Sequence, residues 1–360
     1  MAKKIQLVYT GGYYGNWRTT YGNCKTLATC GATDFVLTTA WGFNYGSASA
    51  SSEIVSTQWV TDNIKYDGRI CEATDKYTVD EFILKPLNEN LGKLTSPAGR
   101  LNYTDFAADM VELAKLIIAQ NSSARIWFAL PPFVEGGTCC ASLYTAPYKA
   151  YIVDKVLAGM SAYMSNVEGF YFAQEDLPLG VTRFETSYPS AEYNSVVCQC
   201  MRDMRAYITS KNSRFKFLWI PYLDPGADYQ KKNGYITNKK DYFDIVILQP
   251  AYYFTPAMSP NIDFAKKCAQ YGTKGAYLQR TGSGVEGGSK TSNVEVGIHI
   301  ELDQDILKTD DRQYLTRFEA YASAYGPMRG QKYSFGCYAG GDVSLMNPGV
   351  MIRVQGFWSV

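Results

Sequence analysis

The sequence is poor in histidine and has no long apolar run. His299 is the single histidine among 360 residues, whereas a zinc site ordinarily recruits several histidine or cysteine ligands. No segment approaches the roughly 20 apolar residues that a membrane-spanning helix needs. The N-terminal stretch MAKKIQLVYTGGYYG has too short an apolar run for a signal peptide. We therefore expect no zinc centre, no membrane partner, and a cytoplasmic protein, or an extracellular one if a leader was removed.

An excess of charge of either sign is also missing. The chain has 35 basic and 34 acidic residues, which gives a formal net charge of +1. Nucleic acids and anionic membranes favour basic patches, so this balance argues against a nucleic-acid partner. The nine cysteines are odd in number and show no spacing typical of a zinc or redox motif, so we expect reduced thiols.

Aromatic residues are abundant, with 29 Tyr, 17 Phe and 6 Trp. Such rings are common where a protein stacks on sugars, and equally common in ordinary cores.

Short apolar runs alternate with amphipathic stretches along the chain, and this alternation predicts a parallel sheet. The strand-like runs are residues 5–10, 34–39, 125–131, 169–174, 216–221, 243–250, 295–301 and 333–339. The helical stretches are residues 104–119, 147–164, 190–211, 261–270 and 310–325.

Eight strand-like runs in one chain predict an α/β fold of the TIM type, a (β/α)8 barrel. An open doubly wound sheet is the alternative, but GGYYGNW after the first run lacks the G-x-G-x-x-G order of a phosphate turn. Residues 41–103 exceed ordinary loop length and follow the second strand, on the rim where barrels place their active sites. Residues 272–293, rich in Gly and Ser, form an insertion before the seventh strand. We expect one domain over residues 1–360.

Side chains alternate across a strand, which places acidic residues inside the predicted barrel. In residues 295–303 the polar side chains, among them His299, Glu301 and Asp303, share one face and the apolar ones share the other. The apolar face must meet the helices, so Glu301 points inward near the C-terminal mouth. The same parity in GFYFAQE places Glu175 inward after the fourth strand.

Two glutamates, after the fourth and seventh strands, predict a retaining glycosidase. One carboxylic acid protonates the leaving oxygen and the other carboxylate attacks the anomeric carbon. We assign Glu175 as the acid/base and Glu301 as the nucleophile. Substrate-binding side chains are expected at other strand ends and on the two acidic strands, where rings stack on sugars and polar groups bind hydroxyls. These are Tyr13, Trp41, Tyr222, Asp224, Gln249, Tyr252, His299 and Asp303.

Other hydrolytic chemistries find less support in the pattern. A serine–histidine triad is possible in principle, but no G-x-S-x-G elbow is present. An all-oxygen Mg²⁺ or Ca²⁺ site at Asp224, Asp303 and Asp305 stays open as an alternative. Asp303 also has a plain alternative role as a supporting or capping group. No metal and no organic cofactor belong to the favoured prediction.

Four of these segments resemble a bacterial family catalogued as domain of unknown function 4855. The family carries G-F-Y-W-x-N-E, W-I-P-Y-Y, Q-P-N-Y-F-F and G-x-E-x-E-F-D in that order. The chain has GFYFAQE, WIPYL, QPAYYF and GIHIELD, and the similarity covers roughly residues 120–340. The resemblance implies that Glu175 and Glu301 are site residues. Gln174 replaces the family's asparagine, and His299 replaces the first glutamate of the last motif.

The predicted function is therefore a glycoside hydrolase that acts on a polysaccharide or oligosaccharide. The first alternative is a non-catalytic carbohydrate-binding barrel, part of a larger surface or viral assembly, which would keep the aromatic residues without needing both glutamates. The second is a carboxylate–metal hydrolase acting on phosphate or acyl groups.

Overall fold

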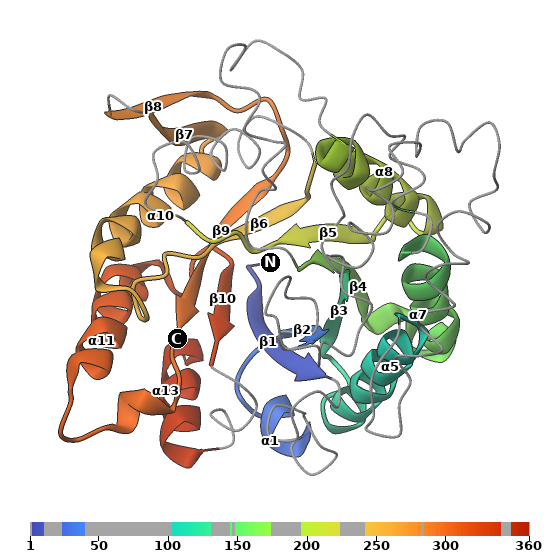
Figure 1. The fold of residues 1–360 in the computed structure, drawn as a ribbon, viewed down its shortest axis with the longest axis horizontal. Coiled ribbons are helices and arrows are strands. Elements are labelled where there is room, and N and C mark those ends of the chain that lie inside the picture. Colours follow the sequence, from blue (N-terminus) through green and yellow to red (C-terminus); the bar gives the residue numbers. More distant parts are fainter. Residues whose placement is uncertain are drawn as a thin grey trace, which may run out of the picture.

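The computed structural model describes residues 2–10, 24–39, 103–130, 145, 148–173, 196–223, 242–281, 284–339 and 347–359. Within these ranges eight parallel strands close into a barrel, in the order β1-β2-β3-β4-β5-β6-β9-β10 and back to β1. Figure 1 shows the strands at the centre and the helices around them. The barrel strands are β1 (Lys4–Thr10), β2 (Asp34–Thr39), β3 (Arg125–Leu130), β4 (Val167–Phe172), β5 (Lys216–Trp219), β6 (Ile245–Leu248), β9 (Glu295–Glu301) and β10 (Phe335–Tyr338).

The (β/α)8 prediction is confirmed, and each of the eight predicted runs contributes one barrel strand. The helices between the strands include α5 (Tyr103–Gln120), α8 (Val196–Lys211), α10 (Ser259–Gly272) and α11 (Gln313–Tyr325). In α5, Met110, Leu113 and Ile117 are buried, as their helical spacing predicts. The predicted helix at 147–164 is divided into a π-helix (Lys149–Val153), α7 (Asp154–Gly159) and a 3₁₀ helix (Ser161–Asn166).

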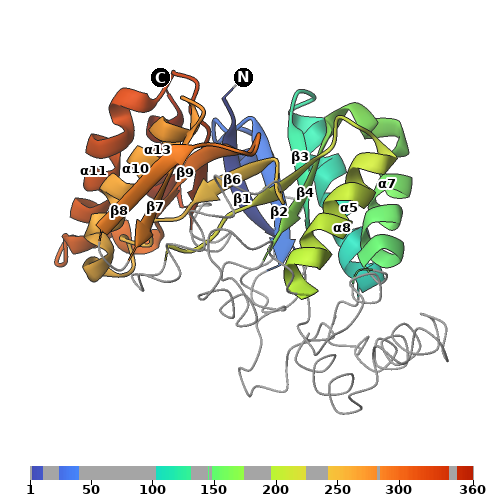
Figure 2. The ribbon, with the colours of Figure 1, turned by 90° about the horizontal axis from the view of Figure 1, so that it is seen from above.

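Three features differ from the prediction or were missed by it. The segment 272–293 is not only a loop, since β7 (Ala276–Thr281) and β8 (Gly284–Ser289) pair antiparallel within it. This hairpin contacts α10 on the outside of the barrel, as Figures 1 and 2 show. Helices α1 (Cys24–Ala28) and α13 (Pro348–Trp358) were not predicted. Asn347 caps α13 through its side chain, which accepts a hydrogen bond from the Gly349 N–H.

Large side chains fill the barrel interior at positions where neighbouring strands carry glycine. Register pairs Gly336 of β10 with His299 of β9, and Ile247 of β6 with Gly297 of β9. A Cβ atom on Gly336 would lie 2.4 Å from His299 Cδ2 and 3.0 Å from Ile247 Cγ2. Strands β6 and β10 are not neighbours, so this contact runs through the interior. The inward polar face predicted for β9 is therefore confirmed at His299.

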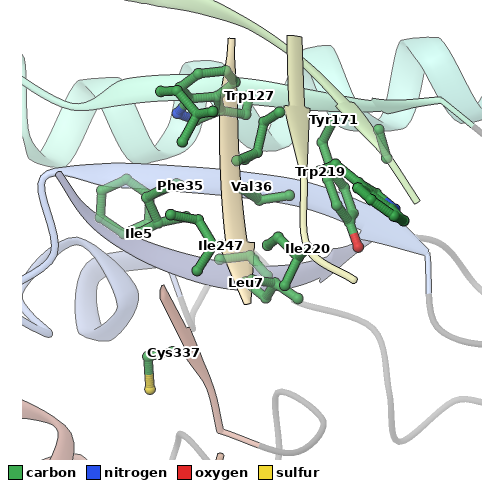
Figure 3. Packing of buried hydrophobic residues seen from close by; sticks show 14 of the residues in the cluster. Ile5, Leu7, Phe35, Val36, Trp127, Tyr171, Trp219, Ile220, Ile247 and Cys337 are labelled. Carbon is green, nitrogen blue, oxygen red and sulfur yellow. The ribbon is translucent and has the colours of Figure 1, made fainter. Parts of the chain in front are cut away.

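The opposite faces of the same strands point toward the helices. Cys337, one position after Gly336, is buried beside Cys30, which follows α1. Figure 3 shows Cys337 pointing away from Ile5, Val36 and Ile247, which lie together in the core. The barrel thus has a well-packed interior and an equally buried outer layer, as this fold requires.

The N-terminal end of the barrel interior is closed by an ionic network. Buried Lys3 pairs with Glu168 of β4 and lies 3.5 Å from Asp34 of β2. Asp34 also accepts hydrogen bonds from Arg125 Nη2 (2.7 Å) and Trp127 Nε1 (3.2 Å). Because these charges satisfy one another, the described side chains at this end offer no unpaired charge, and the candidate site is sought at the opposite, C-terminal end.

Candidate active site

The carboxyl ends of β6, β9 and β10 bring the candidate site together. Glu301 is the last residue of β9, and register places it beside Tyr338 of β10. On its other side, Gln249 directly follows β6 and forms a β-bridge with Tyr222 after β5. Sequence analysis predicted Tyr222, Gln249 and Glu301 as site residues, and the structure places all three at neighbouring strand ends.

Glu301 is fully buried, and its two carboxylate oxygens have different surroundings. Oε2 accepts a hydrogen bond of 2.9 Å from the hydroxyl of Tyr321 on α11. Oε1 has no hydrogen-bond partner among the described residues. Burial raises the pKa of Glu301 to about 7, against the opposing effect of Tyr321, Gln249 and the nearby backbone N–H groups. Near neutral pH this carboxyl therefore takes both protonation states.

Tyr321 also anchors the loop that follows β6. Its hydroxyl accepts hydrogen bonds from the backbone N–H groups of Tyr252 (2.8 Å) and Tyr253 (3.1 Å). One helical turn earlier, the Arg317 guanidinium donates to the Tyr253 carbonyl at 2.7 Å. Helix α11 thus holds both the loop and Glu301.

The same loop has a strained backbone. Ala251 has φ of +59°, the left-handed region that favours glycine. Buried Asn261 of α10 stabilises the segment by donating to the carbonyls of Leu223 (2.7 Å) and Pro250 (3.1 Å). A strained conformation held by several contacts is common beside functional groups. Here it keeps the Ala251 N–H near the Glu301 carboxyl.

His299 lies one pleat below Glu301 on the same inward face. It is fully buried, and neither ring nitrogen has a hydrogen-bond partner among the described residues. Burial lowers the pKa of His299 to about 3, so the imidazole is neutral at physiological pH. Its predicted contact with a sugar hydroxyl stays a prediction.

Asp303 has a structural role in the described part of the chain. It is the N-cap of the 3₁₀ helix Gln304–Leu307, where its Oδ1 accepts from the Asp305 N–H at 2.8 Å. The same oxygen accepts from the Tyr253 hydroxyl at 2.8 Å. These contacts agree with the supporting role considered from the sequence. Asp305 pairs with Lys308 at 2.9 Å.

An aromatic rim borders Glu301. Tyr252 is half-buried and meets Tyr321 edge-on, with ring centroids 6.1 Å apart. Phe254 is 44% exposed, and its ring lies 4.9 Å from that of Tyr253 and 6.0 Å from that of Tyr338. Tyr252 was predicted as a site residue from the sequence. Phe254 and Tyr338 were not, because a ring next to a strand end has no mark that separates it from core aromatics.

Tyr321 and Ala251 were also missed. The spacing of Phe318, Tyr321 and Tyr325 marks the buried face of α11, and all three are buried. That spacing predicts burial without naming the partner of a hydroxyl. Only the packing of α11 on β9 shows that Tyr321 meets Glu301.

Four predicted site residues lie outside the described residues, namely Tyr13, Trp41, Glu175 and Asp224. The predicted alternation along β4 can be followed as far as Tyr171, which pairs in register with Ala129 of β3. The pairing of Glu175 with Glu301, and the retaining geometry that depends on it, stay predictions. No cluster of three or more potential metal ligands occurs among the described side chains. No helix in the described ranges is long and apolar enough to cross a membrane.

Comparisons with known proteins give only distant structural similarities. No protein-family model matches the chain, and no curated protein matches its sequence. Among solved structures, a GH18 chitinase from Pseudoalteromonas aurantia has a TM-score of 0.46 and 11% identity, over 99% of this chain and 100% of that one. A psychrophilic family 10 endo-β-1,4-xylanase has a TM-score of 0.46 and 10% identity, over 98% and 96%.

A pneumococcal exo-β-D-N-acetylglucosaminidase is similar at a TM-score of 0.43 and 10% identity, over 99% of this chain and 83% of the other. Likeness at this level concerns the barrel, which the strand order already establishes. The assignments below rest on the residues of this chain.

Proposed function

We propose that the protein is a glycoside hydrolase in which Glu301 transfers the proton. The observation that carries this proposal is a fully buried glutamate at the C-terminal end of a barrel strand, with one oxygen bound to Tyr321 and the other without a described partner. Catalytic groups of this fold lie at that end. The motif similarity to domain of unknown function 4855 also includes Glu301.

The environment of Glu301 favours a change in its proposed role. Sequence analysis assigned Glu301 as the nucleophile, which must be ionised to attack. Burial instead favours the protonated form near neutrality, and of two catalytic carboxyls the one with the raised pKa acts as the acid. We therefore propose Glu301 as acid/base and Glu175 as its partner carboxylate. A group that donates a proton in one step and accepts one in the next works best with a pKa near the operating pH.

The aromatic rim supports sugar as the substrate. Phe254 is exposed at the edge of the site, and its ring meets the buried ring of Tyr253 edge-on. A flat apolar ring at the edge of such a site suits a pyranose, whose apolar face stacks on aromatic side chains. Tyr222 and Gln249 supply polar groups from the adjacent strand ends.

The test is reducing-end release from a broad panel of polysaccharides, measured for the wild type, Glu301→Gln and Glu175→Gln. Glu319→Gln is the matched control, because Glu319 is exposed on α11. We expect Glu301→Gln to lower release by about 10²-fold or more, since proton transfer alone contributes about 10²–10⁴-fold. Glu319→Gln should match the wild type.

The pH profile then separates the two roles of Glu301. As the acid, Glu301 produces an alkaline limb near pH 7; as the nucleophile, it produces an acidic limb there. Equal release by the wild type and Glu301→Gln would refute the proposal. Saturable sugar binding without release by any variant would instead support the non-catalytic carbohydrate-binding barrel.

A further inference from the structure

The three hydrogen bonds of the Tyr321 hydroxyl determine where its hydrogen points. The backbone N–H groups of Tyr252 and Tyr253 can only donate, so the phenolic oxygen accepts from both. The remaining contact, to Glu301 Oε2 at 2.9 Å, must therefore use the single hydrogen of Tyr321. Tyr321 is a donor to Glu301 in either protonation state of the carboxyl.

We propose that Tyr321 is a positioning residue that makes Oε1 the reactive oxygen of Glu301 and sets the protonation equilibrium of that carboxyl. Because Oε2 already accepts the Tyr321 hydrogen, a proton on Glu301 resides on Oε1. Oε1 is also the oxygen that no described group reaches at hydrogen-bond geometry, although the Gln249 amide and the Ala251 N–H lie near the carboxyl. The catalytic meaning of this assignment rests on the proposed function, whereas the assignment itself concerns a hydrogen bond that exists without substrate.

The arrangement also couples Glu301 to the loop after β6. Two N–H groups of that loop polarise the Tyr321 hydroxyl, which makes it a better donor to the carboxylate. Arg317 holds the Tyr253 carbonyl from the same helix at 2.7 Å. Displacement of Tyr252 and Tyr253 would therefore weaken the bond to Glu301 and raise its pKa. The loop that carries the aromatic rim thus acts on the proton-transfer group.

Among the described residues, the titratable groups around Glu301 are tyrosines, His299 and Asp303, whereas Glu175, its proposed partner carboxylate, lies outside them. From α11, burial raises the pKa values of Tyr321 and Tyr325 well above the usual range. On β9, buried His299 is neutral, and after β9 the Asp303 carboxylate faces Tyr253 and the N-terminus of the helix that it caps. Other described neighbours are Gln249, the β6 loop from Ala251 to Tyr253, and Tyr338 on β10.

The chain offers a matched control for removing the hydroxyl of Tyr321. Tyr325 lies one turn further along α11, is equally buried and stacks on Tyr321 with ring centroids 5.8 Å apart. Its hydroxyl donates to the Ile262 carbonyl at 3.1 Å, with no hydrogen bond to Glu301. Tyr325→Phe therefore removes a buried hydroxyl from the same helix without touching the proposed interaction.

The experiment is a direct titration of Glu301 by ¹³C NMR of protein with labelled glutamate side chains. Glu301→Gln identifies the signal, and no substrate is needed. In Tyr321→Phe we expect the pKa of Glu301 to rise by about one pH unit, because a hydrogen bond to the charged form is lost. In Tyr325→Phe it should stay within a few tenths of a unit. Any pH limb of activity assigned to Glu301 should move in the same direction as the titration.

A second variant covers the case in which Tyr321→Phe fails to fold, since that change leaves two loop N–H groups without an acceptor. Tyr321→difluorotyrosine keeps the hydroxyl and makes it a stronger donor, so the pKa of Glu301 should fall. An unchanged or lowered pKa in folded Tyr321→Phe, or a raised one with difluorotyrosine, would overturn the proposal. Absence of glycosidase activity with the predicted titrations would refute the proposed function while leaving the Tyr321 assignment in place.

Discussion

Relative to the wild type, Glu301→Gln should gain stability as pH rises from acidic to alkaline values. The wild-type carboxyl has a pKa of about 7 when folded, against about 4.5 when exposed. A carboxyl whose folded pKa is raised destabilises the folded state as pH rises, because folding then opposes ionisation. This penalty begins above pH 4.5 and is fully present above pH 7. The amide introduced by Glu301→Gln does not ionise, so that variant escapes the penalty.

The size of the effect follows from the difference between the two pKa values. At 1.36 kcal/mol per unit, a difference of about 2.5 units corresponds to about 3 kcal/mol at pH 8. At pH 5 the wild type is penalised by only about 1 kcal/mol. The advantage of Glu301→Gln should therefore grow by roughly 2 kcal/mol between pH 5 and pH 8. His299 titrates in both proteins, so its contribution cancels in the difference.

The assay is urea unfolding of both proteins across this pH range, followed by circular dichroism. The quantity compared is how the difference in unfolding free energy between the two proteins changes with pH. The contact between the new amide and Tyr321 adds the same free energy at every pH and therefore does not affect this change. Glu319→Gln, on the exposed side of α11, should show a difference that stays flat. A flat difference for Glu301→Gln as well would refute the description of Glu301 as a buried group with a raised pKa.

Three further predictions concern packing, backbone strain and the neutral histidine. Gly336→Ala should lower the free energy of unfolding by about 1–3 kcal/mol, since the new Cβ would lie 2.4 Å from His299 Cδ2. Ala251→Gly should raise it by up to about 1 kcal/mol, because glycine accepts φ of +59° without strain. When pH falls from 8 to 5, the wild type should lose about 2 kcal/mol more stability than His299→Gln. The reason is that the histidine of the unfolded chain takes up a proton below about pH 6.5, whereas the buried imidazole, with a pKa of about 3, stays neutral.

The packing prediction has a control within the same experiment. For Gly336→Ala it is Gly356→Ala in α13, where a Cβ would meet no atom within 4 Å and helix propensity should add up to about 1 kcal/mol. Urea unfolding measures all the variants. The packing argument would be wrong if Gly336→Ala were as stable as the wild type, and the strain argument if Ala251→Gly were less stable. Parallel curves of unfolding free energy against pH for the wild type and His299→Gln would contradict the argument about the histidine.

Local sequence patterns were enough to predict the barrel and the inward face of its acidic strand. Side chains along 295–301 alternate between the barrel interior and the helices, and the apolar side must meet the helices. The inward orientation of His299 and Glu301 therefore followed without knowing which strands lie next to this one. Eight strand-like runs separated by helical stretches left few topologies to consider. The same reasoning failed for the hairpin at 276–289, because its second strand, GVEGGS, is rich in Gly and lacks the apolar pattern of a buried strand.

The properties that distinguish Glu301 were decided by the tertiary structure. Its raised pKa comes from complete burial, and its bound oxygen from a tyrosine twenty residues further along the chain. Neither can be read from residues 295–301 alone, because burial depends on every strand and helix that surrounds the position. Ala251 shows the same limit, since nothing about alanine indicates a left-handed backbone. The sequence by itself determined which side chains face the interior, and three-dimensional packing decided what those side chains meet there.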